Sequence, residues 1–350
     1  MTPTIRTDPL TGERVIIAQA RGKRPNAAEG EASPKATDAE KARCPFCEGK
    51  EGETPAEVFA VGPEGRAPDS PDWSIRVFPN KFSALSAVHI EDLENDSPFQ
   101  KNEGLEPGVE RAAFGYHEVI VETPQHDARL DELSVEHLAR VIGVFRTRIR
   151  RHYEDPGVEY VQVFKNEGKA AGASLPHPHT QLMALGFVPP RIERIAALHG
   201  QGSKRGGGCI TCTHIERERE SGKRIIFDEG GFLALTPFAS RVPYEVAIFP
   251  VGHSERFETE GQDDQDLAHC IQAVLRKLRG VGQGAYNLVI RTSPAARAGA
   301  AEAGGGAPAP LHWCVEIFPR TTIFAGFELA SGAYVNPVSP ETAAEGLRKR

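Results

Sequence analysis

The feature that most constrains the fold of this 350-residue chain is an order of motifs that occurs twice. In the first half a CxxC pair is followed by apolar runs, the segment EVIVETPQH, a helical pattern and LPHPHTQL. The second half carries a CxxC pair, EVAIFPVGH, another helical pattern and PLHWCVEI in the same order. Repetition of this kind indicates a duplicated structural unit. We therefore expect one unit over residues 1–200 and a second over residues 201–350, with a Gly-rich break near residues 202–208.

The periodicity of apolar residues predicts several strands and one long helix in each unit. Residues 117–122 and 159–164 read as strands in the first unit, and residues 244–249 and 285–291 in the second. Between the strands of each pair, apolar residues recur at intervals of three and four, which is typical of an amphipathic helix. The apolar positions are Leu138, Val141, Ile142, Phe145 and Ile149, and then Leu267, Ile271, Val274, Leu275 and Leu278. We expect an α+β fold of two duplicated units, each an antiparallel-rich sheet with a covering helix.

Composition and charge exclude several classes of function. Hydrophobic residues make up 39% of the chain and charged residues 25%, which excludes a disordered protein. A net charge of −7 provides no broad positive surface for a nucleic-acid backbone, so we expect no nucleic-acid partner. No apolar run approaches the roughly 18 residues of a membrane span, and the first ten residues lack an apolar signal core. We therefore expect no membrane contact and a cytoplasmic location.

Four of the six cysteines form two CxxC pairs, Cys44 with Cys47 and Cys209 with Cys212. In a reducing compartment such pairs indicate metal ligands before disulfides. The alternative interpretation is a buried pair of reduced cysteines.

His177, His179 and Gln181 stand two residues apart in an extended segment, so their side chains share one face. An imidazole can act as a nucleophile that accepts a phosphoryl group on one ring nitrogen while the other nitrogen donates a hydrogen bond. Two histidines at this spacing can equally be metal ligands, or polar residues at the edge of a strand. The residues alone leave these three interpretations open.

The motif HPHTQ at residues 177–181 resembles the active-site signature of the galactose-1-phosphate uridylyltransferase branch of the histidine-triad superfamily. That signature, His-Pro-His-x-Gln, follows an Asn- and Gly-rich loop, and here residues 166–174 precede it. Further matching pieces are residues 8–13 and 21–25 near the start, and residues 325–328 and 336–337 near the end. The resemblance covers nearly the whole chain and extends to relatives of the ADP-glucose phosphorylase type. It implies that the two expected units are histidine-triad-like domains, of which the first is catalytic and the second lacks the nucleophile.

The resemblance implies a double displacement, in which His179 attacks the α-phosphorus of a nucleotide sugar and holds the nucleotide covalently. Related hydrolases carry histidine where this chain has Gln181. An amide can donate to a phosphate oxygen but cannot act as a general acid near neutral pH, which favours transfer over hydrolysis.

Three functions follow in order of preference. The first is transfer of a uridylyl group from UDP-glucose to galactose 1-phosphate. The second is a nucleoside-diphosphate-sugar phosphorylase that uses ADP-glucose or UDP-glucose with inorganic phosphate. The third is a zinc-stabilised nucleotide-binding protein without turnover.

The resemblance also implies two zinc sites, each with the two sulfurs and two nitrogens that suit tetrahedral coordination. The first set is Cys44, Cys47, His126 and His177. The second follows from the internal repeat and from the two-zinc layout of the phosphorylase-type relatives, and it is Cys209, Cys212, His253 and His312. His214 competes as a ligand of the second site. Cys314 and Glu316 stand at the repeat positions of His179 and Gln181, so we expect one catalytic centre per chain.

The remaining family matches concern the substrates, which we expect to be a nucleotide sugar and a sugar 1-phosphate bound by a homodimer. Arginines are suited to phosphate binding through their fork of donors. Typical uridylyltransferases carry aspartate at the position of Lys81, so the family match does not determine which nucleotide base is bound. The matching residues are Arg21 and Arg24 for phosphate, Asn80 for the nucleotide, Asn166 and Ser174 for the attacked phosphate, and Glu328 and Asn336 for the hexose.

Overall fold

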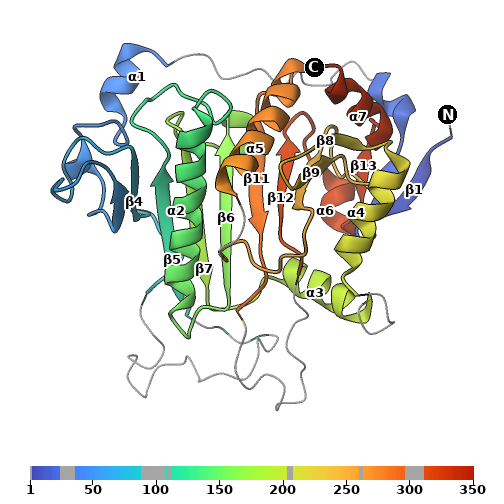
Figure 1. The fold of residues 1–350 in the computed structure, drawn as a ribbon, viewed down its shortest axis with the longest axis horizontal. Coiled ribbons are helices and arrows are strands. Elements are labelled where there is room, and N and C mark those ends of the chain that lie inside the picture. The colour runs from blue at the N-terminus through green and yellow to red at the C-terminus, as the bar shows by residue number, and fades with distance from the viewer. Residues whose placement is uncertain are drawn as a thin grey trace.

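The computed structural model describes residues 2–23, 36–87, 108, 110, 112–202, 208–259, 263–295 and 311–350. Its main feature is a ten-stranded sheet in the order β3-β4-β5-β7-β6-β11-β12-β10-β9-β8, in which all neighbouring strands run antiparallel (Figure 1). The first-half strands are β3 (Phe59–Val61), β4 (Ile75–Pro79), β5 (Gly115–Val121), β6 (Tyr160–Glu167) and β7 (His179–Leu185). The second-half strands are β8 (Ile225–Glu229), β9 (Phe232–Leu235), β10 (Val246–Pro250), β11 (Tyr286–Arg291) and β12 (Cys314–Pro319).

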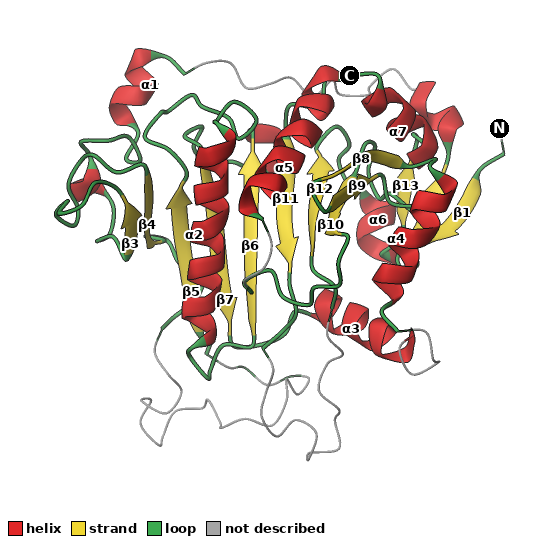
Figure 2. Ribbon diagram, in the orientation of Figure 1, coloured by secondary structure: helices red, strands yellow, loops and turns green. Residues whose placement is uncertain are grey.

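Two long helices, α2 (Val135–Tyr153) and α5 (Asp264–Gly280), pack side by side on one face of this sheet (Figure 2). Ser134 caps α2 by accepting a hydrogen bond from a first-turn backbone N–H, and Asp263 caps α5 in the same way. The apolar positions predicted for both helices are buried in one shared core, since their spacing puts them on the face toward the sheet. The α+β fold with antiparallel sheet and covering helices is therefore confirmed.

The two halves repeat one topology. The strand order β3-β4-β5-β7-β6 in the first half matches β8-β9-β10-β12-β11 in the second, and the halves meet where β6 pairs with β11. They therefore share one sheet and one apolar core. The division at residue 200 stays a prediction, and that position falls inside α3 (Pro190–Gly202). Residues 203–207 of the expected break lie outside the described residues.

Several strand ends differ from the prediction. The strand expected at residues 244–249 begins at Val246, because Tyr244 has a φ of 60°, a left-handed conformation that interrupts a strand. The strand expected at residues 117–122 starts two residues earlier and ends before Glu122.

A second sheet of three strands was missed. β1 (Thr4–Thr7) pairs antiparallel with β2 (Arg14–Ile17), and β13 (Tyr334–Asn336) pairs parallel with β2, so this sheet joins the two ends of the chain (Figure 1). Strands of three or four residues are too short for alternation to be recognised. The shorter helices are α1 (Asp38–Arg43), α4 (Ile210–Ser221), α6 (Gly326–Ser331) and α7 (Pro340–Arg348). None of the helices in the described part of the chain has the length and apolar character needed to cross a membrane.

Candidate active site and metal centres

The first Cys/His group gathers ligand atoms from three distant segments. Cys44 ends α1, Cys47 lies in the following turn, His126 follows β5 and His177 precedes β7. Their ligand atoms all lie within 4.8 Å of one another, and Sγ of Cys47 is 3.2 Å from Nδ1 of His126 and 3.6 Å from Nδ1 of His177. Ligands of one tetrahedral zinc ion lie about 3.3–3.8 Å apart, so these four residues fit such an ion.

Groups outside the ligand set orient it. Nε2 of His177 donates to the carbonyl oxygen of Thr123 at 2.8 Å, which turns Nδ1 toward the two sulfurs. Burial lowers the pKa of His177 to about 4, so this ring is neutral and free to coordinate at pH 7. Burial and the neighbouring Cys44 raise the pKa of Cys47 to about 11. A bound cation would lower this pKa again and favour the thiolate.

The second group repeats this arrangement in the second half. Cys209 immediately precedes α4, Cys212 lies in its first turn, His253 follows β10 and His312 precedes β12. Sγ of Cys212 lies 3.6 Å from Nδ1 of His253 and 3.5 Å from Nδ1 of His312, and the four ligand atoms lie within 4.8 Å of one another. Nε2 of His312 donates to the carbonyl of Pro250 at 2.9 Å, as His177 does to Thr123.

His214 does not belong to the second group. Its Nε2 lies 3.7 Å from a carboxylate oxygen of Glu218 within the same helix. The geometry therefore favours His253 as the fourth ligand.

His179, the predicted nucleophile, begins β7. Its Nδ1 donates to the carbonyl of His177 at 2.8 Å, so Nε2 keeps its lone pair. The ring packs edge-on against Phe46 from the CxxC turn, with centroids 5.3 Å apart. Burial lowers the pKa of His179 below its ordinary value, which keeps the imidazole neutral at pH 7. His177, a member of the first Cys/His group, thus orients the His179 ring through its carbonyl group.

Gln181 and Asn80 meet at a residue that the sequence analysis missed. Nε2 of His117 lies 2.9 Å from Oε1 of Gln181 and 3.1 Å from Nδ2 of Asn80. Oδ1 of Asn80 accepts the backbone N–H of Phe82 at 2.9 Å, which fixes this amide. Alternation along residues 117–122 could have revealed His117, because Val119 pairs with Gln181 and His117 shares the face of Val119.

The loop before β7 draws on both halves of the chain. Asn166, near the end of β6, accepts a hydrogen bond at 2.8 Å from Nδ2 of Asn287 on β11. Asn287 also donates to the carbonyl of Ala171 at 2.9 Å, which ties down the loop that leads to Ser174. Gly172 ends the 3-10 turn Lys169–Ala171 with a φ of 86°, a conformation that favours glycine. Ser174 is exposed.

The other predicted substrate residues lie apart from this cluster. Arg21 is exposed in the 3-10 turn Gln19–Lys23, and Arg24 lies outside the described residues. Glu328 on α6 is half-buried and accepts the backbone N–H of Ala325. Asn336 is fully buried and donates to the carbonyls of Ser240 and Val242, so its amide holds the fold together here. Contact of these residues with substrate stays a prediction.

In the second half, an ion-pair cluster fills the position that the candidate active site has in the first half. Glu316 pairs with Arg191 at 3.0 Å and with Arg241 at 3.4 Å, and Glu13 pairs with the same two arginines. Cys314, at the position of His179, is fully buried. The remaining cavity has a volume of about 20 Å³, which is too small for a nucleotide.

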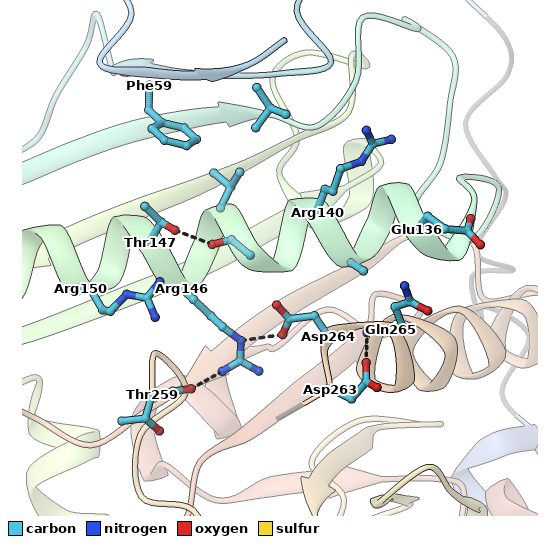
Figure 3. A pocket seen from close by; sticks show the side chains of 14 residues that line it. Phe59, Glu136, Arg140, Arg146, Thr147, Arg150, Thr259, Asp263, Asp264 and Gln265 are labelled. Atoms are coloured by element: carbon cyan, nitrogen blue, oxygen red, sulfur yellow. Dashed lines mark hydrogen bonds and ion pairs between the residues drawn. The ribbon is translucent and has the colours of Figure 1, made fainter. Parts of the chain in front are cut away.

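A larger cavity of about 950 Å³ lies on the helical side, between β3, α2 and the start of α5 (Figure 3). Arg146 projects toward it but is already paired with Asp264 at 2.7 Å and donates to the carbonyl of Thr259. Thr180 faces α2, so its neighbours His179 and Gln181 point to the other face of the sheet. This cavity is therefore separate from the candidate active site.

Comparison with known proteins gives this geometry a family. Residues 1–189 match the family model described as galactose-1-phosphate uridyl transferase, N-terminal domain. The chain belongs to the galactose-1-phosphate uridylyltransferase family. The predicted resemblance is confirmed, and membership of this family makes the chain a nucleotidyltransferase.

Individual relatives match over almost the entire chain. ADP-glucose phosphorylase of Arabidopsis thaliana is 32% identical over 353 residues, which cover 99% of this chain and 93% of that protein. Galactose-1-phosphate uridylyltransferase of Thermotoga maritima is 29% identical over 99% of this chain and 98% of its own. The crystal structure of the Arabidopsis ADP-glucose phosphorylase with bound ADP-glucose has a TM-score of 0.80 and 30% identity, and the alignment covers 100% of this chain and 99% of that one. Both activities therefore occur among proteins that share this fold.

Proposed function

We propose that this chain transfers a uridylyl group from UDP-glucose to galactose 1-phosphate through a covalent nucleotidyl-histidine at His179. The observation that carries the proposal is the hydrogen bond from Nδ1 of His179 to the carbonyl of His177. It leaves Nε2 as a neutral nucleophile, on the same face of the sheet as the Gln181 amide.

In the first step Nε2 of His179 attacks the α-phosphorus, and a new N–P bond forms. The bond from the α-phosphorus to the bridging oxygen breaks, and its electron pair leaves with the sugar 1-phosphate. The proton stays on Nδ1, held by the His177 carbonyl. In the second step a phosphate oxygen of the acceptor attacks the same phosphorus and the electron pair returns to the imidazole.

The residues around His179 suit this reaction. The amide of Gln181 can donate to a non-bridging phosphate oxygen, but it offers no acidic or basic group to activate water. Asn80 and Gln181 contact the same nitrogen of His117, which connects the predicted nucleotide contact with the phosphate contact. Attack by a second phosphate is therefore favoured over hydrolysis.

We further propose that zinc occupies both Cys/His groups. Each group supplies four ligand atoms, which would fill all four coordination positions of a tetrahedral zinc ion, as in structural zinc sites. When bound, zinc would keep the cysteines as thiolates and fix the segments that carry its ligands. Through His177 the first site would also fix the backbone at His179.

A nucleoside-diphosphate-sugar phosphorylase is the second candidate. The similarity to Arabidopsis ADP-glucose phosphorylase supports it. So does Lys81, an exposed cation next to Asn80 where typical uridylyltransferases carry aspartate. In this reaction inorganic phosphate would discharge the same nucleotidyl-histidine.

A homodimer is also part of the proposal. Apolar side chains near α6 are unusually exposed, namely Ile323 at 90%, Phe327 at 50% and Leu329 at 78%. Exposed apolar groups of this kind favour burial against a partner. Sedimentation of the wild type and of Leu329→Glu measures this, and a wild-type monomer would contradict it.

Labelled nucleotide sugars test the reaction directly. Incubation with UDP-glucose or ADP-glucose labelled in the nucleotide should give acid-labile label on His179. His179→Ala should lose both label and sugar–nucleotide exchange while keeping its metal, whereas the matched control His269→Ala, an exposed histidine on α5, should keep all three. Retained exchange in His179→Ala would exclude the covalent mechanism.

The acceptor decides between the two candidates. The loaded enzyme is offered galactose 1-phosphate or inorganic phosphate, and the specificity constants are compared for the two nucleotides. A preference for ADP-glucose with inorganic phosphate would establish the phosphorylase in place of the uridylyltransferase.

A further inference from the structure

A buried charged cluster lies directly behind the strand that carries His179. Lys165 on β6 is 1% exposed, and its Nζ donates to Oε2 of Glu122 at 2.9 Å and to the carbonyl oxygen of His179 at 3.3 Å. Nζ is also 3.3 Å from a carboxylate oxygen of Glu167. A lysine ammonium has three protons, so each has an acceptor within this cluster.

Glu122 completes the cluster just after the end of β5. This residue is fully buried, and Oε1 accepts the hydroxyl proton of Thr180 at 2.6 Å. Its backbone N–H donates to the carbonyl of Pro178 at 3.2 Å, and its own carbonyl accepts from Nε2 of His137 on α2 at 2.7 Å. The cluster therefore contacts three consecutive residues, 178–180, with the proposed nucleophile in the middle.

The second half of the chain shows that this fold does not need polar groups at these positions. Thr180 pairs with Ile120, and Val315 pairs with Ile248, which aligns β5 and β7 with β10 and β12. Phe164 pairs with Gln181, and Val289 pairs with Glu316, which aligns β6 with β11. The resulting equivalent pairs are Lys165 with Ile290 and Thr180 with Val315. Glu122 corresponds to Pro250 in this strand register and to the neighbouring Phe249 in the motif order.

The second-half residues at these positions are all apolar and buried, namely Phe249, Pro250, Ile290 and Val315. The desolvation of a buried ion pair often costs as much as its attraction returns, and apolar side chains of similar volume are commonly as stable. The charged cluster thus occurs in the half that carries His179, and apolar packing takes its place in the half that has Cys314 instead.

We propose that Lys165 and Glu122 are positioning residues that hold the strand segment of His179 in register for attack on the α-phosphorus. This inference rests on the proposed function of His179. The cluster holds the segment from the core side through the His179 carbonyl and the Thr180 hydroxyl, and a zinc ion bound by the first Cys/His group would hold its start at His177. Fixing both sides matters because a misplacement of about 1 Å can slow a reaction roughly 100-fold.

The smallest test removes one hydroxyl. Thr180→Val abolishes the hydrogen bond to Glu122 without changing the side-chain shape. The rate of label transfer to His179 at saturating nucleotide sugar should fall about tenfold, as expected for a lost hydrogen bond to a charged acceptor, while KM stays unchanged.

The matched control is Thr292→Val in the second half. Thr292 is likewise buried and donates to a buried carboxylate, that of Glu258, at 2.9 Å. This variant should transfer label at the wild-type rate, which separates positioning of His179 from a general loss of packing.

The larger test transplants the apolar character of the second half. The triple variant Lys165→Ile, Glu122→Leu and Thr180→Val should fold, with metal content and a urea midpoint close to those of the wild type. Label transfer should slow roughly 10- to 100-fold with little change in KM. If this variant fails to fold, the comparison of Thr180→Val with Thr292→Val decides the question.

Two outcomes overturn different claims. If the wild type labels His179 and Thr180→Val labels it equally fast, the positioning role of the cluster is wrong while the covalent mechanism stands. If the wild type labels no histidine with either UDP-glucose or ADP-glucose, the proposed function itself is wrong.

Discussion

His199 should make the stability of this protein depend steeply on pH between about pH 6.5 and pH 4. The side chain lies on α3, is 3% exposed, and its Nε2 contacts the carbonyl of Leu10 at 3.2 Å. Burial and the nearby Arg291 guanidinium lower the pKa of His199 from 6.5 to about 4. The folded protein therefore holds this imidazole neutral where the unfolded chain would protonate it.

The size of the effect follows from proton linkage. Because the folded pKa is depressed, the contribution of His199 to stability is complete above pH 6.5 and is lost as the pH falls toward 4. Between pH 8 and pH 5 the unfolded chain takes up a proton that the folded chain refuses, which amounts to about 2 kcal/mol.

Urea unfolding at pH 8 and pH 5, with zinc present throughout, measures this loss. His199→Gln keeps a donor for the Leu10 carbonyl but cannot titrate. Between pH 8 and pH 5 its unfolding free energy should therefore fall by about 2 kcal/mol less than that of the wild type. His269→Gln, on the exposed side of α5, should retain the wild-type pH dependence. If wild type and His199→Gln lose stability in parallel, His199 is not held neutral in the folded state and the reasoning is refuted.

Three further predictions concern the two zinc sites, the amide of Gln181 and the ion-pair cluster around Glu316. Purified protein should contain about two zinc ions per chain by metal analysis, and one zinc ion per chain would count against the repeat. In unfolding and labelling assays, Cys44→Ser should lower both stability and label transfer, whereas Cys209→Ser should act mainly on stability. The isolated nucleotidyl-enzyme should hydrolyse slowly and discharge rapidly when galactose 1-phosphate is added, as measured by release of label, and rapid hydrolysis would remove the role given to Gln181. Glu316→Ala leaves three arginines without their shared carboxylate and should cost about 3–5 kcal/mol of unfolding free energy. Label transfer to His179 should continue in this variant, and its loss in folded protein would show that the cluster has a role beyond stabilising the fold.

The sequence was sufficient for features that repeat or alternate. Both Cys/His groups could be predicted because each ligand stands at the same place in the motif order of its half, next to a strand end. His179 and Gln181 could be placed on one face because a strand alternates strictly.

Features that depend on distant, non-repeating contacts could not be predicted in this way. The pairing of Arg191 with Glu13 and Glu316 joins residues separated by 178 and 125 positions, and no local pattern marks such partners. The three-stranded sheet brings together residues from opposite ends of the chain, so its short strands gain their stability from each other rather than from propensity. Asn336 matched a substrate-binding region by position, yet burial gives its amide backbone partners.

The register at the junction of the halves has an evolutionary consequence. Phe164 on β6 pairs with Val289 on β11. These two residues occupy the same place in their own halves, because Phe164 also pairs with Gln181 and Val289 also pairs with Glu316, the repeat counterpart of Gln181. An approximate two-fold axis therefore passes through this pair. Two separate copies of a single-unit ancestor, joined edge to edge as a symmetric dimer, would build the same ten-stranded sheet. A gene fusion of two such copies would free one copy of the site to become an ion-paired support.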